Sequence, residues 1–476
     1  MRQGMIGVLL LLTVLFDSSL CLSEKGRIAL TKAYGGINIE ERRERLRNLG
    51  LSASEQNTIS GTAGQTTLVD STSEDVLDGE TTAVDDDSIL AINRREGIDE
   101  YLYGGDMILT EEQLSALEHP TRQKRQIRSG ARRWENNTVS YYFDVNITAA
   151  NQDLVRTHLK YISNRTCVKF VENANATNLI KVIDGSGCWS YVGMLSREQE
   201  LSLASGCFSQ ATVVHEFMHA LGVQHMHMRS DRDKFLKVNL TYVNPNSQHN
   251  FAKDPNSLNL TPFEYGSVMQ YSSNSFSTNG NSMTPLTAGF GRTMGSRLVS
   301  FYDIRMINIH YKCNVPCNGL PKTAKCLNGG APNPKNCKVC LCPLGYGGGL
   351  CGQRKPGCGA ALVAASTWKG RNITVVRNTT TPTSEPHVTC NDWITAPAGK
   401  KIQVRLMKLT NVQCRNGCTV NAFEPKLMAN KAITNRRLCC DADLTTIRTS
   451  NISPMPVVAY TSSNVATTFF YHYRFI

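Results

Sequence analysis

The chain has 476 residues, 17 cysteines and a formal net charge of +12. This length is too great for one ordinary domain and predicts two to four domains, and the clustered cysteines favour an oxidising compartment over the cytosol. We find no nucleic-acid-binding motif, so the basic charge favours anionic matrix or acidic protein partners rather than nucleic acid.

The N-terminus has the layout of a secretory signal peptide, which we predict at residues 1–22. Arg2 begins a short basic region, and residues 5–16 form an apolar core that is too short to span a membrane. Removal of this peptide takes away Cys21 and leaves sixteen cysteines, all of which can pair. No later apolar run reaches eighteen residues, so we expect a secreted, soluble, extracellular product without a membrane span.

Asn-x-Ser/Thr sequons fit this secretory route, and all of them follow residue 130. The candidate glycosylation sites are Asn136, Asn146, Asn164, Asn175, Asn239, Asn259, Asn372, Asn378 and Asn451.

Residues 23–125 lack cysteine and are predicted to form a propeptide. A short helix is predicted at Glu40–Leu49, whereas the polar run at 51–87, which ends in three aspartates, is predicted to be disordered. Residues 24–125 carry 12 Lys/Arg and 20 Asp/Glu, which leaves about +20 on the remainder of the chain. Opposite charges favour association of the two parts before cleavage.

The end of this segment, Arg-Gln-Lys-Arg at 122–125, predicts a processing site. We expect an activating convertase to cut between Arg125 and Gln126. A solvated basic loop is the alternative, but the composition changes sharply at this point.

A second feature of the propeptide is the run Tyr103-Gly104-Gly105-Asp106. Paired glycines let a backbone approach another surface closely. The aspartate so presented could occupy a coordination position on a metal ion, and an ordinary turn is the alternative.

The next region alternates predicted strands and helices, which indicates a mixed α+β domain with a cleft. The expected strands are 139–144 and 179–183, and the expected helices are 152–164, 213–222 and 303–312.

The motif HExxHxxGxxH begins at His215. His215 and His219 are four residues apart, so they project from one face of a helix toward one metal ion. Gly222 can end the helix with a positive φ, after which the chain delivers His225 as a third ligand. Three imidazoles with an open fourth position indicate catalytic zinc, and Glu216 is placed to act as the general base.

Downstream lies Ser267-Val268-Met269-Gln270-Tyr271. Together with His215–Asp233, this run resembles the astacin family of metzincin zinc endopeptidases. The resemblance implies an α+β protease domain at residues 126–314, one Zn²⁺ per subunit, and Met269 in a tight turn under the metal. It also implies that Tyr271 ligates zinc at rest and stabilises the oxyanion during catalysis.

The same resemblance implies three further features. Residues 187–193 are similar to the edge strand on which a substrate peptide pairs as an added strand. Asp106 matches the aspartate of the F-x-G-D motif that blocks zinc in astacin-like zymogens, with tyrosine in place of phenylalanine. Arg297 is a candidate for the cation of the S1′ pocket, and a simple surface charge is the alternative.

Two positions depart from the family pattern. Met226 stands where the family usually has a glutamate that receives the N-terminal ammonium of the mature enzyme. Cleavage before Gln126 would expose a residue that can cyclise to neutral pyroglutamate, so we expect this chain to dispense with that salt bridge or to anchor its N-terminus differently. Gln270 replaces a common histidine beside the tyrosine, and we expect no effect on the chemistry.

Cysteine spacing after residue 314 indicates one small disulfide-rich module, and the runs Cys390–Pro397 and Tyr471–Arg474 carry the resemblance to a second module. Residues 315–353 resemble an EGF-like domain, with a zinc knuckle as the less favoured rival, and residues 358–476 resemble a degenerate CUB domain, which is a β-sandwich with strands expected at 401–407 and 456–460. The family patterns imply the pairs Cys167–Cys313, Cys188–Cys207, Cys317–Cys337, Cys326–Cys340, Cys342–Cys351 and Cys358–Cys390. Spacing alone does not fix these pairs. We expect vicinal Cys439 and Cys440 to pair with Cys414 and Cys418 rather than with each other.

The sequence therefore predicts a secreted zinc endopeptidase that is made as a zymogen. Its expected partners are extracellular protein or peptide substrates, a convertase, and matrix components bound through the EGF-like and CUB-like modules. The alternative is a matrix-binding or adhesion protein in which the protease domain is vestigial.

Overall fold

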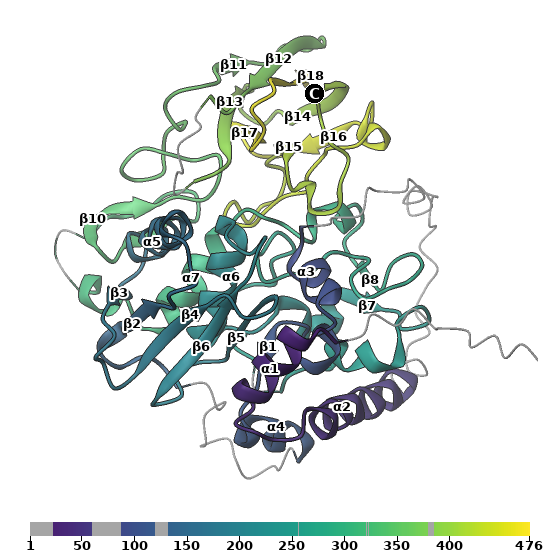
Figure 1. The fold of residues 1–476 in the computed structure, drawn as a ribbon. Helices are drawn as coiled ribbons and strands as arrows, with labels where there is room; N and C mark the ends of the chain where they lie inside the picture. Colours follow the sequence, from purple (N-terminus) through teal and green to yellow (C-terminus); the bar gives the residue numbers. More distant parts are fainter. Residues whose placement is uncertain are drawn as a thin grey trace, which may run out of the picture.

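The computed structural model describes residues 22–59, 87–119, 132–255, 257–319, 321, 323–378 and 385–476. The predicted signal peptide, apart from its last residue, and the predicted cleavage site between Arg125 and Gln126 lie outside these ranges. In Figure 1 the C-terminal strands lie at the top, a central α+β domain lies in the middle, and most of the N-terminal helices lie below it.

The N-terminal segment (residues 22–59 and 87–119) is helical. Its elements are α1 (Glu24–Ala33), α2 (Ile39–Ile59), α3 (Ile89–Arg95), β1 (Met107–Ile108) and α4 (Glu111–Glu118). The predicted helix at Glu40–Leu49 is confirmed, but α2 continues ten residues further, so the expectation of disorder is wrong for the start of the polar run. Those ten residues contain no proline, the residue that most strongly breaks a helix, and include the good helix formers leucine, alanine, glutamate and glutamine.

The central domain is built on a six-stranded sheet of order β1-β5-β6-β4-β2-β3. Its own strands are β2 (Thr138–Phe143), β3 (Lys169–Glu172), β4 (Leu179–Ile183), β5 (Cys188–Tyr191) and β6 (Glu198–Leu203). Within the sheet the pairing of β5 with β6 is antiparallel, and the N-terminal segment contributes β1 beside β5 in parallel register. The predicted edge strand is therefore covered by a strand from the N-terminal segment.

Three helices complete the central domain: α5 (Ala149–Ser163), α6 (Gln210–Ala220) and α7 (Phe301–His310). The side chains of Thr148, Ser209 and Ser300 cap their first turns by accepting a backbone N–H. The predicted strands and helices of this region are confirmed, although α6 begins three residues earlier than expected because its cap is Ser209. A short hairpin of β7 (Leu236–Val238) and β8 (Met283–Pro285) lies near α3.

The C-terminal part consists of a small two-stranded module and a β-sandwich. The module contains β9 (Ala331–Asn333) and β10 (Asn336–Leu341). The strands of the sandwich are β11 (Ala361–Val363), β12 (Lys369–Val375), β13 (Val388–Thr395), β14 (Ile402–Thr410), β15 (Asn421–Pro425), β16 (Arg448–Ser450), β17 (Met455–Thr461) and β18 (Thr467–Phe475). They form two four-stranded sheets, β11-β13-β17-β15 and β12-β18-β14-β16, which enclose one apolar core. The multidomain fold class expected from the sequence is confirmed.

Eight disulfides cross-link the described residues. They join Cys167 to Cys313, Cys188 to Cys207, Cys317 to Cys337, Cys326 to Cys340, Cys342 to Cys351, Cys358 to Cys390, Cys414 to Cys440 and Cys418 to Cys439. The first six pairs are those implied by the family patterns, and the vicinal cysteines pair outward.

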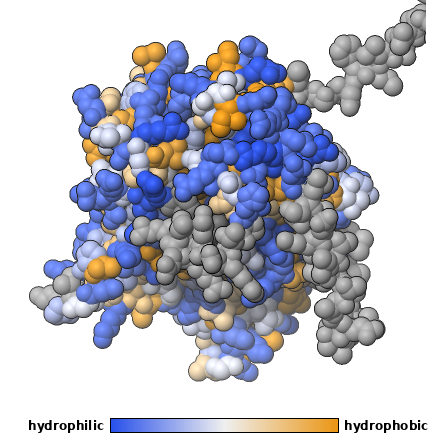
Figure 2. Space-filling view, turned by 90° about the horizontal axis from the view of Figure 1, so that it is seen from below, coloured by the Kyte–Doolittle hydropathy of each residue, from blue (hydrophilic) through white to orange (hydrophobic). Residues whose placement is uncertain are grey.

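The molecular surface is mainly polar on the face shown in Figure 2, where hydrophobic residues form only small separate groups in the coloured region. Each asparagine of the nine sequons is exposed. None of the described helices is long and apolar enough to cross a membrane.

Candidate metal centre

Helix α6 brings two histidines to one point. The four-residue spacing places the Nε2 atoms of His215 and His219 3.0 Å apart, and both side chains are buried. The helix ends before Gly222, whose φ of +91° is a conformation that favours glycine. The chain then returns His225, whose Nε2 lies 3.1 Å from that of His215. The three predicted ligands are therefore together.

The hydrogen bonds of the His215 and His219 rings define which nitrogen of each ring is free to bind a metal ion. Nδ1 of His215 donates to the carbonyl oxygen of Val268 at 2.8 Å, and Nδ1 of His219 donates to that of Val223 at 2.8 Å. With the proton on Nδ1, each Nε2 presents a lone pair to the centre of the cluster. Burial lowers the pKa of His219, and it lowers the pKa of His225 to about 4, so neutral imidazoles converge here.

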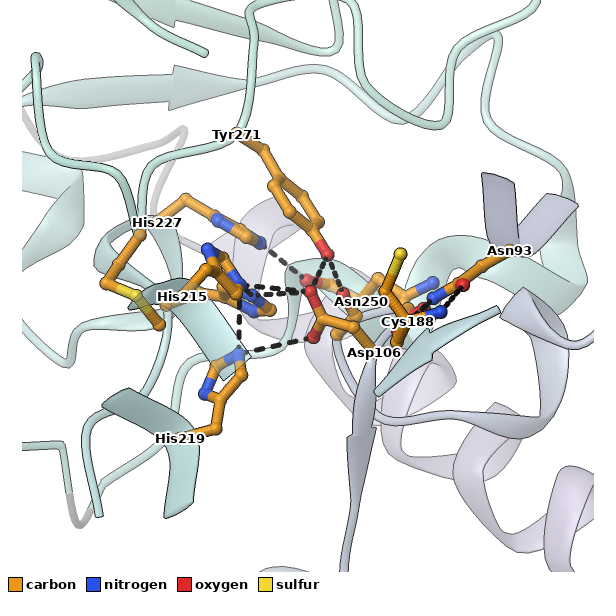
Figure 3. A network of polar contacts seen from close by, with 12 residues as sticks. Asn93, Asp106, Cys188, His215, His219, His227, Asn250 and Tyr271 are labelled. Carbon is orange, nitrogen blue, oxygen red and sulfur yellow. Dashed lines mark hydrogen bonds and ion pairs between the residues drawn. The ribbon is translucent and has the colours of Figure 1, made fainter. Parts of the chain in front are cut away.

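Asp106 of the N-terminal segment completes the cluster (Figure 3). Its Oδ2 lies 3.1 Å from Nε2 of both His215 and His225, and its Oδ1 lies 3.4 Å from Nε2 of His219. Burial opposes ionisation of Asp106, but positive charge at the adjacent Nε2 atoms, from protons or from a metal ion, would hold its pKa well below the usual range. The lone pairs on Nε2 of His215 and His219 and the carboxylate of Asp106 face one point and repel one another unless a cation lies between them. The donor set of three nitrogens and one oxygen fits Zn²⁺.

Two glycines let Asp106 reach this point. Gly104 and Gly105 have φ of +67° and +84°, and a Cβ on Gly104 would lie 2.6 Å from Nδ1 of His225. The side chain of Asn93 on α3 donates to the carbonyl oxygens of Gly105, at 2.8 Å, and of Cys188, at 2.7 Å, and accepts from the Cys188 amide. Asn93 thus fixes the turn to the edge strand, as Figure 3 shows. No sequence motif marks Asn93, and we did not predict its role.

Tyr271 also meets Asp106. Its hydroxyl donates to Oδ2 of Asp106 at 2.6 Å, and the same hydroxyl oxygen lies 2.7 Å from the carbonyl oxygen of Gly104. The ring of His227 stacks against His225, with centroids 5.2 Å apart, and against Tyr271, at 5.0 Å, while the centroids of His225 and Tyr271 are 4.5 Å apart, so the three rings form one cluster. His227 was also not predicted from the sequence, because its contact with Tyr271 joins residues 44 positions apart.

Glu216 is fully buried beside the cluster, and neither of its carboxylate oxygens has a hydrogen-bond partner among the described residues. Burial, and then the negative charge of Asp106, raise the pKa of Glu216 well above its ordinary value. A carboxyl group with a raised pKa has a high affinity for a proton. Glu216 is therefore suited to accept a proton beside the metal site once the carboxylate of Asp106 has left.

The turn beneath the histidines is held by a buried carboxylate. Asp303 accepts hydrogen bonds from the hydroxyl of Ser267, at 2.5 Å, and from the amide of Val268, at 3.0 Å. The amide of Met226 donates to the carbonyl oxygen of Met269 at 2.9 Å. Met226 is buried, and its sulfur lies 3.7 Å from Nη1 of Arg229. Met226 therefore contacts the turn through a backbone hydrogen bond, and its buried side chain carries no charge.

A cavity of about 680 Å³ adjoins the cluster and is lined by His215, Tyr271 and Arg297, among others. Arg297 forms a two-pronged ion pair with Asp87 of the N-terminal segment, with Nη1–Oδ2 and Nη2–Oδ1 distances of 2.7 Å each. Its side chain therefore lines this cavity and pairs there with a carboxylate of the N-terminal segment.

Comparisons with known proteins converge on one family. The profile of the astacin peptidase family matches residues 126–312. Zinc metalloproteinase nas-32 of Caenorhabditis elegans is 41% identical over 81% of this chain and 60% of its own length, and nas-31 is 36% identical over 79% and 63%. The chain thus spans less than two thirds of these two relatives.

Zinc metalloproteinase nas-17 of the same organism is 38% identical over 80% of this chain and 90% of its own length. Among solved structures, high choriolytic enzyme 1, a hatching enzyme zinc-protease from Oryzias latipes, is 30% identical, with a TM-score of 0.36. That match covers 38% of this chain and 94% of that protein.

Proposed function

The chain belongs to the astacin family of peptidases, and from this membership we propose that it is a secreted zinc-dependent endopeptidase made as a zymogen. It hydrolyses internal peptide bonds of extracellular proteins. The observation that carries the proposal is the meeting of the Nε2 atoms of three buried histidines with a carboxylate from a separate segment.

Nε2 of His215, His219 and His225 would hold one zinc ion. Bound zinc supplies a Lewis acid that polarises the scissile carbonyl and lowers the pKa of water. Glu216 takes the proton from the attacking water and delivers it to the leaving amine. Tyr271 donates its hydroxyl hydrogen to the oxyanion, a role supported by its present hydrogen bond to a negatively charged oxygen.

Latency is proposed to come from the N-terminal segment, residues 23–125. Asp106 occupies the position that water and the scissile carbonyl need, and it also accepts the hydroxyl hydrogen of Tyr271 that would serve the oxyanion. A convertase would cut between Arg125 and Gln126 and start a mature chain with domains at 126–314, 315–353 and 358–476. The disulfides and the nine exposed sequons support passage through the secretory route.

Arg297 is proposed to bind an acidic side chain just after the cleaved bond. Its guanidinium already holds the Asp87 carboxylate through two parallel contacts. A substrate carboxylate would replace Asp87 in the same geometry after the N-terminal segment leaves.

Peptide hydrolysis by the chain, after its N-terminal segment is removed, tests this function. We expect one zinc per chain by mass spectrometry of the metal, loss of activity with a chelator, and recovery when zinc is returned. Glu216→Gln keeps the shape of the side chain, so it should retain zinc and lose about 10²–10⁴-fold in kcat. Activity that survives either treatment refutes the proposal, and an inactive zinc-loaded protein would favour the matrix-binding alternative.

A further inference from the structure

The C-terminal sandwich is joined to the central domain through buried polar contacts. The amide of Thr434 donates to Oε2 of Glu264 at 3.1 Å, and the amide of Arg437 donates to Oγ1 of Thr293 at 3.0 Å. Nη1 of Arg437 donates to Oγ of Ser296 at 2.6 Å. Arg437 and Glu264 are fully buried, so the sandwich fixes the segment that ends at Arg297.

A cavity of about 310 Å³ lies at this junction and is called the junction cavity below. The central domain contributes Arg297, the sandwich contributes Arg377 and Arg415, and the N-terminal segment contributes Asp87. Arg297 and Asp87 also line the larger cavity that reaches the zinc ligands. A peptide that passes Arg297 on leaving the metal centre therefore meets the junction cavity next.

The charge of the junction cavity is positive. Three of its lining residues are arginines, and Asp87 is the one carboxylate among the described lining residues. Burial lowers the pKa of His158 and of His387, which also line it, to about 4, so the arginines set the charge at neutral pH.

The chain itself offers an occupant of complementary charge. Asp87 pairs with Arg297, and in the sequence it ends the run Asp85-Asp86-Asp87. The pair is two-pronged, which is the geometry that a guanidinium and a carboxylate favour, with Arg297 mostly buried and Asp87 mostly exposed. The N-terminal segment thus places Asp87, the last residue of an acidic run, at a cavity lined by three arginines.

We propose that the junction cavity is a second acidic subsite of the substrate cleft, built jointly by the central domain and the sandwich. It accepts an Asp or Glu side chain beyond the residue that meets Arg297, and the acidic run ending at Asp87 fills it in the zymogen. This inference rests on the proposed function and adds to it: the sandwich domain takes part in choosing the bond that is cut.

Two matched peptides test the subsite in the activated enzyme. Both carry aspartate directly after the cleaved bond, and they differ in having Asp-Asp or Asn-Asn at the next two positions. We expect Arg377→Gln and Arg415→Gln each to lower kcat/KM for the Asp-Asp peptide about tenfold and for the Asn-Asn peptide less than twofold. Arg474→Gln, which alters a sandwich arginine away from both cavities, should change neither. Equal losses on both peptides, or no loss, overturn the proposal.

A binding measurement separates this inference from the protease proposal. A fluorescent peptide with the sequence of residues 81–95 is titrated against the N-terminally trimmed protein, beside a version with asparagine at 85 and 86. In both versions residue 87 stays aspartate, so that its pair with Arg297 is kept and only residues 85 and 86 differ. We expect the aspartate version to bind at least tenfold more tightly to the wild type and to lose that advantage in the Arg377→Gln, Arg415→Gln double variant. Equal binding of the two peptides refutes the subsite, whereas failed hydrolysis with charge-dependent binding refutes only the protease activity.

Discussion

Replacing Gly104 by alanine should release the latency of the uncleaved protein. Gly104 has a φ of +67°, and an added Cβ would lie 2.6 Å from Nδ1 of His225 and 2.8 Å from the end of the Met107 side chain. The left-handed backbone costs alanine roughly 1–2 kcal/mol, and overpacking adds about 1–3 kcal/mol. A total of about 2–5 kcal/mol corresponds to roughly 30- to 4,000-fold weaker blocking of the site.

Gly35→Ala is the matched control for this change. Gly35 has nearly the same φ, +66°, but nothing lies within 4 Å of the place where its Cβ would be. The two variants therefore share the backbone cost and differ in the contact with His225. The difference between them should be about 5- to 150-fold, which corresponds to 1–3 kcal/mol.

The assay is peptide hydrolysis by full-length protein that cannot be processed, because its three basic residues at 122, 124 and 125 are replaced by alanine. Basal hydrolysis is expressed as a fraction of that of the fully activated enzyme. We expect a large rise for Gly104→Ala and a much smaller one for Gly35→Ala. Equal rises would refute the reasoning, because the close contact at the third histidine would then contribute nothing to latency.

Three further predictions concern catalysis and the domain junction. Tyr271→Phe in the activated enzyme should lower kcat about 100-fold by removing one oxyanion donor, with zinc content unchanged by metal analysis; an unaltered kcat would exclude this role. Arg437→Gln removes one of two cations beside buried Glu424 and should cost about 1.5–3 kcal/mol, seen as a lower Tm in calorimetry, whereas partly exposed Arg474→Gln should leave Tm nearly unchanged. Burial raises the pKa of Glu264 from 4.5 to about 7, so the stability it contributes is complete below pH 4.5 and is lost as pH rises through 7. Over that range the free energy of unfolding should fall by roughly 3 kcal/mol, and this part of the fall should be absent in Glu264→Gln.

Local patterns made the metal cluster predictable. The spacing of His215 and His219 fixes their common face as soon as the segment is helical, and Gly222 supplies the turn that returns His225. Strands and helices of the central domain were predictable for the same reason, since each follows the periodicity of its own residues. Helix α6 begins earlier than expected because Ser209 caps its first turn. The periodicity of the apolar residues does not reveal such a cap.

Contacts between distant segments could not be predicted in this way. Asn93 meets Cys188, and Thr434 meets Glu264, only because separate elements pack together. Neither asparagine nor threonine carries a spacing that marks such a partner. The predicted ligand set could therefore be named from the sequence, whereas the groups that position it, including His227, required the three-dimensional arrangement.

The apolar contacts of the N-terminal segment determine what a cut at the junction does. Leu30 and Tyr34 share a buried cluster with Trp189 and Tyr191 of the edge strand, and Met107 shares another with Val192. Cutting the backbone removes none of these contacts; it turns an intramolecular association into a bimolecular one. Blocking then depends on protein concentration, and activity should appear on dilution, at the rate at which the severed segment dissociates rather than at the rate of the cut.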